Sequence, residues 1–300
     1  NAAGCVTGKP ITQGGIRGRN EATGLGVAYG LREFYECKDY LKEFNLEPGI
    51  EGKTVALQGF GNVGYNSAKF LQEFGAKIIA VSEFEGMLTD KNGIDVKDLY
   101  EHKMKGGTFK DYKKATFTDK RDEVFSLDCD VLLPAALEAQ ITEENYDIVK
   151  AKVIAEGANG PVTYEANKKL FKKGIVILPD IYLNAGGVTV SYLEWIKNLA
   201  HIRFGRIQKR YDERNFKNIA KLLHEVTNKE IDEERLQKYV TEGDEKNLVF
   251  SGLEETMINS LHLLMNFCKD KNYKVDLRTA AFAIALEKIS LSYKENGVFP

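Results

Sequence analysis

The residues with the clearest potential for chemistry are Gly59-Phe60-Gly61-Asn62-Val63-Gly64, which have the G-x-G-x-x-G spacing of a turn that can bind a dinucleotide pyrophosphate. The three glycines have different expected roles. Gly59 permits the tight turn, Gly61 lets the backbone approach the pyrophosphate, and Gly64 lets the following helix lie close on the strand. The phosphates would lie on the N–H groups at the helix start. The spacing alone has low specificity, and an ordinary glycine-rich strand-to-helix turn is the alternative.

The residues around this turn predict a βαβ unit. Residues 55–57 have strand composition, apolar residues recur at helical spacing over 63–74 until Gly75, and residues 76–81 give a second strand. Glu83 closes that strand roughly 20 residues after the glycine turn, where a dinucleotide-binding fold places the acid that accepts from a ribose hydroxyl. The full pattern therefore favours nucleotide binding.

The composition favours small-molecule chemistry. The chain has 300 residues, 43% of them hydrophobic, and a net charge of −2 with a pI near 6.2. This balance gives no electrostatic reason to expect nucleic acid or an anionic membrane as a partner. No apolar run reaches the ~18 residues that a membrane span needs, so no membrane insertion is expected.

The cysteines predict neither a disulfide framework nor a metal site. Cys5, Cys37, Cys129 and Cys268 are far apart, without a C-x-x-C motif or a local His/Cys cluster. We expect them to be reduced and largely buried.

Alternating elements predict a doubly wound, Rossmann-type parallel sheet with helices on both faces. Strand composition returns at residues 129–136, 153–159 and 175–180, and helical patterns such as 163–173 separate these segments. Each strand ends in small or polar residues, and ligands of open α/β sheets lie beyond the carboxyl ends of the strands. These ends are candidate walls of a site, although ordinary turn chemistry would explain any single one.

The other segments predict mainly helices. Residues 1–19 are glycine-rich and should be loop with at most one short strand, after which Asn20 would cap a helix. Residues 85–125 are polar, with a turn at 90–93 and a surface helix at 96–104. Residues 207–250 are dense in charge and predict a helical insertion, and two amphipathic helices at 251–268 and 277–293 close the chain.

Taken together, these segments resemble the hexameric glutamate dehydrogenases, specifically the animal type that carries a helical antenna. The motifs that carry the resemblance are TGKP (7–10), GGIRGR (14–19), ATG (22–24), GFGNVG (59–64), AEGANGP (155–161), LNAGGVTVSY (183–192) and DLRTAA (276–281). The resemblance covers essentially the whole chain, and only residues 207–250 match loosely.

The resemblance implies four parts. Residues 1–18 would be the remnant of an N-terminal substrate domain, 19–206 the dinucleotide-binding Rossmann domain, 207–250 an antenna-like insertion, and 251–300 the pivot and C-terminal helices. The family's catalytic lysine and aspartate would precede the point where this chain begins. We therefore expect no catalytic residue in this chain, and we expect the chain alone to bind NAD without turning over glutamate.

The implied activity is reversible oxidative deamination of L-glutamate to 2-oxoglutarate and ammonia, with NAD as cofactor and NADP as a second candidate. The resemblance assigns the nicotinamide and its ribose to Thr23 and Asn159, the pyrophosphate to Phe60, Asn62 and Val63 beside Gly59, Gly61 and Gly64, and the adenosine ribose to Glu83. It places Ala135 and Ala136 along the cofactor groove, and Arg19, Asn184, Val188 and Ser191 at the substrate, with Asn184 also near the cofactor.

Ser191 bears on the choice of substrate. A serine in an apolar helix most often bonds to its own backbone, so this residue alone has little weight. In the resembling family it would bond the distal carboxylate, a charge-assisted bond that rejects apolar side chains and favours glutamate over leucine or phenylalanine. The alternatives are another amino-acid dehydrogenase of the leucine or phenylalanine type, or a non-catalytic nucleotide-binding half-enzyme.

The resemblance also implies a homohexamer, formed through antenna and sheet contacts, in the mitochondrial matrix, with regulatory nucleotides as ligands. Leu25, Glu73 and Phe250 stand where animal enzymes carry basic side chains that bind inhibitory GTP. We therefore expect GTP to inhibit this enzyme poorly. Glu83 would repel a 2′-phosphate at short range, which favours NAD over NADP.

Overall fold

The computed structural model describes residues 4–201, 206–227 and 244–297. It divides into two compact units, which are described separately. The sheet unit comprises Thr23–Gly186 and Thr256–Pro300, and the helical unit comprises Asn1–Ala22 and Gly187–Glu255. The predicted antenna-like segment, 207–250, lies partly outside the described residues, because 228–243 are not among them.

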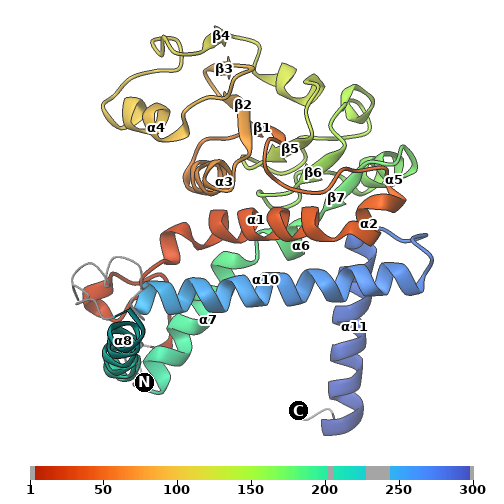
Figure 1. The fold of residues 1–300 in the computed structure, drawn as a ribbon. Coiled ribbons are helices and arrows are strands. Elements are labelled where there is room, and N and C mark those ends of the chain that lie inside the picture. Colours follow the sequence, from red (N-terminus) through yellow and green to blue (C-terminus); the bar gives the residue numbers. More distant parts are fainter. Residues whose placement is uncertain (1–3, 202–205, 228–243, 298–300) are drawn as a thin grey trace. The chain divides into compact units, whose positions relative to one another are not determined.

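The sheet unit contains a seven-stranded sheet in the order β4-β3-β2-β1-β5-β6-β7 among the described residues (Figure 1). Five of its strands run parallel, because β1 pairs with both β2 and β5, β5 with β6, and β6 with β7. This arrangement confirms the predicted Rossmann-type α/β fold. The strands are β1 (Thr54–Gln58), β2 (Lys77–Glu83), β3 (Gly86–Thr89), β4 (Thr116–Thr118), β5 (Val131–Pro134), β6 (Val153–Ala155) and β7 (Val176–Leu178).

The two strands at one edge differ from the prediction of a wholly parallel sheet. β3 pairs antiparallel with β2, and β4 pairs antiparallel with β3. Both strands are short, and they lie in the polar segment where the sequence predicts only a turn and a helix. An antiparallel edge on a mostly parallel sheet is common in doubly wound folds.

The helices follow the predicted pattern with local differences. Those of the sheet unit are α2 (Lys38–Glu43), α3 (Asn62–Glu73), α4 (Val96–Met104), α5 (Tyr164–Lys172), α6 (Asp180–Leu183) and α11 (Leu277–Asn296). The chain passes between the units along α1 (Arg19–Glu36), α7 (Gly186–Leu199) and α10 (Glu245–Asp270), and α8 (Arg206–Thr227) belongs to the helical unit. Short 3-10 turns occur at Ile11–Gln13, Arg121–Ser126 and Tyr146–Ile148.

One prediction for the start of the chain is wrong. α1 begins at Arg19, so Asn20 lies inside the helix and is not its cap. The described part of the glycine-rich segment forms a 3-10 turn and loops, which agrees with the predicted loop. The helix starts that carry polar caps are elsewhere: Asp95, Thr163 and Asp276 accept from N–H groups in the first turns of α4, α5 and α11.

The core of the sheet unit is built on the central strands. Ala56, Ala80, Leu132, Ile154 and Ile177, one from each of the five parallel strands, are all buried in one apolar cluster. Burial of both faces explains why these strands have nearly continuous apolar composition.

Glycines bring α1 very close to its neighbours within the sheet unit. A Cβ on Gly24 would lie 2.5 Å from the Cβ of Asn66 on α3, and a Cβ on Gly30 would lie 2.7 Å from a methyl carbon of Leu183 on α6. α1 therefore packs almost backbone to backbone on α3 and closely on α6, the two helices next to the predicted cofactor residues.

The cysteines differ partly from expectation. Cys129 and Cys268 are buried and Cys37 is half-buried, but Cys5 is exposed. None of the described helices is long and apolar enough to cross a membrane.

Candidate functional site

The three glycines of the turn between β1 and α3 differ in what a side chain at each position would meet. Gly59 has a φ of +90°, and a Cβ there would lie 2.8 Å from the carbonyl oxygen of Ala135. A Cβ on Gly64 would lie 1.9 Å from the carbonyl oxygen of Gly59, so the helix can lie this close only with glycine. A Cβ on Gly61 would meet nothing within 4 Å. The chain thus leaves open space at the one glycine where a pyrophosphate would approach.

The start of α3 is suited to bind an anion. Gly61 precedes the helix without a side-chain hydrogen bond to cap it, and both Gly61 and Asn62 are exposed. The N–H groups of a first helical turn have no partner within the helix, and together with the helix dipole they attract phosphate. The residues present therefore fit the pyrophosphate of a dinucleotide.

Glu83 at the end of β2 adjoins this turn. Its Oε1 accepts a hydrogen bond from the Phe60 N–H at 2.5 Å, and Lys103 Nζ lies 3.9 Å from the same oxygen. The parallel pairing of β1 with β2, which sets Gln58 beside Ser82, brings the two strand ends together. A carboxylate at this point can accept from ribose hydroxyls, as the sequence predicts.

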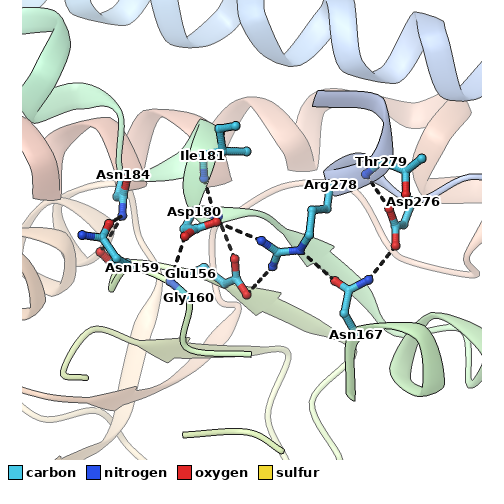
Figure 2. Close-up of polar contacts among 11 residues, drawn as sticks. Glu156, Asn159, Gly160, Asn167, Asp180, Ile181, Asn184, Asp276, Arg278 and Thr279 are labelled. Atoms are coloured by element: carbon cyan, nitrogen blue, oxygen red, sulfur yellow. Dashed lines mark hydrogen bonds and ion pairs between the residues drawn. The ribbon is translucent and has the colours of Figure 1, made fainter. Parts of the chain in front are cut away.

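A second group of predicted residues meets at the carboxyl ends of β6 and β7. Asn184 Nδ2 donates to Asn159 Oδ1 at 2.7 Å and lies 3.5 Å from the Gly157 carbonyl oxygen (Figure 2). Asn159 is exposed and Asn184 half-buried. The structure thus joins the two asparagines that the sequence assigns to the nicotinamide end, while their binding role stays a prediction.

A buried ionic network adjoins this pair (Figure 2). Glu156, with no exposed side-chain surface, accepts from Arg278 Nη2 at 2.5 Å and from the Asp180 N–H at 2.7 Å. Arg278 Nη1 also donates to Asp180 Oδ1 at 2.9 Å (Figure 2). One guanidinium from α11 therefore holds two carboxylates at the ends of β6 and β7.

The two carboxyl groups respond oppositely to this environment. Burial raises the pKa of Glu156 to about 7, even though Arg278 and the Asp180 N–H oppose the rise. Burial also acts to raise the pKa of Asp180, but the N–H groups of Gly160 and Ile181 and the Arg278 guanidinium outweigh it and lower that pKa. Asp180 is thus the firmly ionised partner.

The network reaches the candidate site through one hydrogen bond. The Gly160 N–H donates to Asp180 Oδ2 at 2.8 Å, which fixes the loop that carries Asn159. On its other side, Arg278 Nε donates to Asn167 Oδ1 at 3.2 Å, and Asn167 Nδ2 donates to Asp276 Oδ2 at 2.6 Å. The start of α11 therefore positions the loop at the nicotinamide end.

Sequence reasoning missed this network. The apolar strand β6 ends at Ala155 and is followed directly by Glu156, which is completely buried. A charged residue directly after an apolar strand indicates that it has a buried partner. The sequence contains the DLRTAA motif that carries Arg278, but nothing local joins it to Glu156, which lies 122 residues away.

In the helical unit, the structure brings two predicted substrate residues together. Arg19 Nε donates to Ser191 Oγ at 2.8 Å, so the serine bonds a side chain 172 residues away. Val188, one helical turn before Ser191 on α7, is 73% exposed. Asn184 and the predicted cofactor residues belong to the sheet unit.

α7 also holds the glycine-rich segment that leads to Arg19. Asn198 Nδ2 donates to the Gly14 carbonyl oxygen at 3.0 Å, and Lys197 Nζ donates to the Gly15 carbonyl oxygen at 2.9 Å. These bonds explain why residues 14–19 have a defined path despite their glycine content.

Lys9 is engaged in a buried ion pair. Its Nζ lies 2.7 Å from Glu194 Oε1, and the Gly8 N–H donates to Glu194 Oε2 at 2.9 Å. Burial opposes ionisation of Glu194, but Lys9 and the two backbone N–H groups lower its pKa. Lys9 therefore ties the start of the described chain to α7 within the helical unit.

The remaining predicted cofactor residues border the groups described above. Thr23 is half-buried on α1 beside Gly24, the glycine that lies against α3. Ala135 is half-buried and Ala136 exposed at the end of β5, next to Gly59. Val63 is half-buried in the first turn of α3.

A mostly parallel sheet, a glycine turn that opens onto a helix start, and an acid at the end of the second strand define a dinucleotide-binding domain of the Rossmann type. Residues 14–246 match the model of the family described as Glutamate/Leucine/Phenylalanine/Valine dehydrogenase. The chain belongs to this family.

Comparison with individual proteins points to the glutamate dehydrogenases within the family. The mitochondrial glutamate dehydrogenase of Dictyostelium discoideum is 46% identical over 98% of this chain and 58% of its own length. An NAD-specific glutamate dehydrogenase of Staphylococcus aureus is 44% identical over 66% of this chain and 45% of its own length. The hetero-hexameric glutamate dehydrogenase of Thermus thermophilus, in a leucine-bound form, superposes with a TM-score of 0.70 at 25% identity, over 98% of this chain and 58% of that one. The chain thus spans less than two thirds of the length of these relatives.

Proposed function

We propose that this chain is the nucleotide-binding part of a glutamate dehydrogenase, which catalyses the reversible oxidative deamination of L-glutamate to 2-oxoglutarate and ammonia. The observation that carries the proposal is the bond between Arg19 and Ser191. The 46% identity to the Dictyostelium enzyme supports it.

The Arg19–Ser191 pair suits a carboxylate ligand. Because the guanidinium donates to Ser191 Oγ, the serine oxygen acts as acceptor in that bond and its own hydrogen is directed elsewhere. That O–H can donate to the distal carboxylate of glutamate, and the positive charge of Arg19 adds attraction for the same group. A leucine side chain would leave the Ser191 O–H without this acceptor and the Arg19 charge without the carboxylate, which disfavours leucine.

The cofactor groove uses residues of the sheet unit. When bound, NAD supplies the group that accepts a hydride from the substrate Cα. We assign the pyrophosphate to the start of α3 over Gly61 and the adenosine ribose to Glu83. Ala135 and Ala136 line the groove, and the nicotinamide end falls to Thr23, Asn159 and Asn184.

We propose NAD as the preferred cofactor. The Glu83 carboxylate accepts from the hydroxyls of an unmodified ribose and repels a 2′-phosphate. The NAD-specific relative from Staphylococcus aureus supports this preference. NADP is the second candidate, because Lys103, 3.9 Å from Glu83, provides a cation that would partly offset the repulsion.

The proposal keeps the four parts expected from the sequence, with the antenna at 207–250. It adds assembly as a hexamer, by likeness to the hetero-hexameric Thermus enzyme, with identical subunits as the sequence predicts. It also adds a mitochondrial location, by likeness to the Dictyostelium enzyme. Poor inhibition by GTP is also part of the proposal: Leu25 is buried and Glu73 Oε1 is paired with Lys97 Nζ at 2.9 Å, so neither residue offers a cation to a triphosphate.

Two experiments test the function. In the complete enzyme, kcat/KM for glutamate should exceed that for leucine and that for phenylalanine, and a preference for either apolar substrate would overturn the assignment. For the chain by itself, titration with NADH should show saturable binding, while glutamate should give no NADH production. Production of NADH by the isolated chain would refute the expectation that the proton-transfer groups lie outside it.

A further inference from the structure

Three side chains of types that ligate metals meet in the sheet unit, away from the residues discussed so far. Glu33 on α1, Cys37 just before α2 and His262 on α10 place a carboxylate oxygen, the thiol sulfur and an imidazole nitrogen within 4.8 Å of one another. Linear spacing could not reveal this group, because Glu33 and His262 are 229 residues apart.

The geometry of this cluster is close to that of a metal site. Glu33 and Cys37 are four residues apart, which sets them one helical turn from each other at the end of α1. Glu33 Oε1 lies 2.7 Å from His262 Nε2. Zinc bonds of roughly 2.0–2.3 Å to N, O and S ligands give tetrahedral edges of about 3.5 Å, so small side-chain rotations suffice to gather the three ligand atoms around one ion.

The cluster is open to solvent on one side. The His262 side chain is 50% exposed, whereas that of Glu33 is 17% exposed and Cys37 is half-buried. An ion can therefore enter from water, and a water molecule can complete a fourth position. The carboxylate of Glu36 adds negative charge beside the thiol, which favours a cation.

We propose that Glu33, Cys37 and His262 bind a transition-metal ion of the Zn²⁺ class, with a water molecule as the fourth ligand. The mixture of thiolate, imidazole and carboxylate selects zinc-like ions over Mg²⁺ and Ca²⁺, which prefer oxygen ligands alone. On binding, the thiol loses its proton and the imidazole gives its Nε2 lone pair to the ion instead of sharing a hydrogen bond with Glu33.

The bound ion would join the end of α1 to α10 within the sheet unit. Cys37 is 14 residues beyond Thr23, about 20 Å along a helical path at ~1.5 Å per residue. The ion is thus several helical turns from Thr23, and its role is to stabilise the packing of α1, the helix that packs on both α3 and α6.

The first test measures metal binding directly. The protein is titrated with Zn²⁺ against a chelating dye, and with Co²⁺ while the thiolate-to-metal charge-transfer band is followed. We expect one ion per chain and a thiolate-to-metal charge-transfer band. Loss of a residue that only supports a metal ligand typically weakens metal binding by roughly 10–100-fold, and we expect Cys37→Ser and His262→Gln, which remove ligands, each to weaken it by more. Cys5→Ser, which removes an exposed thiol outside the cluster, is the matched control and should bind like the parent.

A second test needs no substitution within the cluster. Zn²⁺ should protect Cys37 of the unmodified protein from alkylation while Cys5 continues to react, and it should raise the melting temperature of the parent and of Cys5→Ser but not of Cys37→Ser. Zn²⁺ binding that leaves Cys37 reactive, or that survives both cluster substitutions unchanged, would place the ion elsewhere and overturn the proposal. Absence of saturable binding would overturn it as well.

Discussion

Replacing Arg278 by methionine removes the guanidinium that bonds the buried carboxyl of Glu156, while most of the aliphatic volume is kept. The pair lies in the interior, with 16% of the Arg278 side chain and none of the Glu156 side chain exposed. Removal of one partner of a buried ion pair typically costs about 3–5 kcal/mol, because the group left in the interior must either stay charged without compensation or be neutralised at a cost in free energy. Arg278→Met should therefore lower the free energy of unfolding by an amount in this range at pH 8.

The pH dependence of this loss makes the prediction sharper. The pKa of Glu156 is about 7 in the folded protein against an ordinary value of 4.5, so the folded state binds the proton more tightly and stability falls as pH rises between these values. From pH 6 to pH 8, the titration of Glu156 lowers the free energy of unfolding of the parent protein by about 1.3 kcal/mol. Arg278 lowers this pKa, so without its guanidinium the pKa rises further, and the loss grows toward a limit of about 2.7 kcal/mol over the two pH units. The effect of the substitution should thus be larger at pH 8 than at pH 6, by up to about 1.4 kcal/mol.

Urea unfolding of parent and variant at both pH values measures this difference directly, and groups unaffected by the substitution cancel in the comparison. Lys97→Met breaks an exposed pair with Glu73 and serves as a control, with a small effect that is equal at both pH values. When Arg278→Met is introduced into a Glu156→Gln variant and compared with that variant, the pH difference should be absent, because the titrating carboxyl is missing from both proteins. If Arg278→Met destabilises equally at pH 6 and pH 8, the raised pKa of Glu156 is wrong.

Four further substitutions test the candidate site. Gly61→Ala should fold normally but bind NADH about tenfold more weakly in a fluorescence titration, because its Cβ enters the open space at the helix start. Gly64→Ala should instead lower the free energy of unfolding in urea by about 1–3 kcal/mol or more, since its Cβ would lie 1.9 Å from the Gly59 carbonyl oxygen. Ser191→Ala in the complete enzyme should lower kcat/KM for glutamate by a factor that corresponds to about 1.5–3 kcal/mol of lost transition-state stabilisation, the value of a hydrogen bond to a charged group. The low kcat/KM for leucine should stay unchanged. Glu83→Gln should improve the affinity for NADPH relative to NADH by about tenfold or more, because like-charge repulsion is removed, and an unchanged ratio of dissociation constants would argue against its position at the ribose.

The elements that carry the proposed cofactor residues could be predicted from the sequence because their determinants are local. The strand at 55–57, the glycine turn and Glu83 lie within one stretch whose periodicity changes from strand to helix and back, and the structure reproduces it as β1, α3 and β2. The edge strands β3 and β4 could not be predicted in the same way. Each has only three or four residues, and each forms because a neighbouring strand offers hydrogen-bonding groups, which is not a property of the segment itself.

Contacts between distant residues account for most of what sequence reasoning missed. Ser191 alone predicts a bond to its own backbone, but the fold brings the guanidinium of Arg19 to it. The same holds for Glu156 and Arg278, which each stand in a recognisable motif but whose pairing depends on the fold as a whole. A sequence pattern can thus indicate that a residue needs a partner without identifying the partner.

Close packing and ionic anchoring together explain how the two ends of the proposed cofactor groove are positioned within the sheet unit. Gly24 sets α1 against α3, whose first turn faces the phosphate end, and Gly30 sets the same helix against Leu183, the residue before Asn184. Because both contacts are closer than a Cβ would allow, α1 can slide relative to neither helix without a steric clash. From α11, Arg278 fixes the loop of Asn159 through Asp180 and Gly160. The asparagine pair is therefore held from two directions by elements far from it in sequence. Substitutions of Gly30 or Arg278, residues not assigned to the cofactor, should thus act on cofactor binding through the positions of these elements.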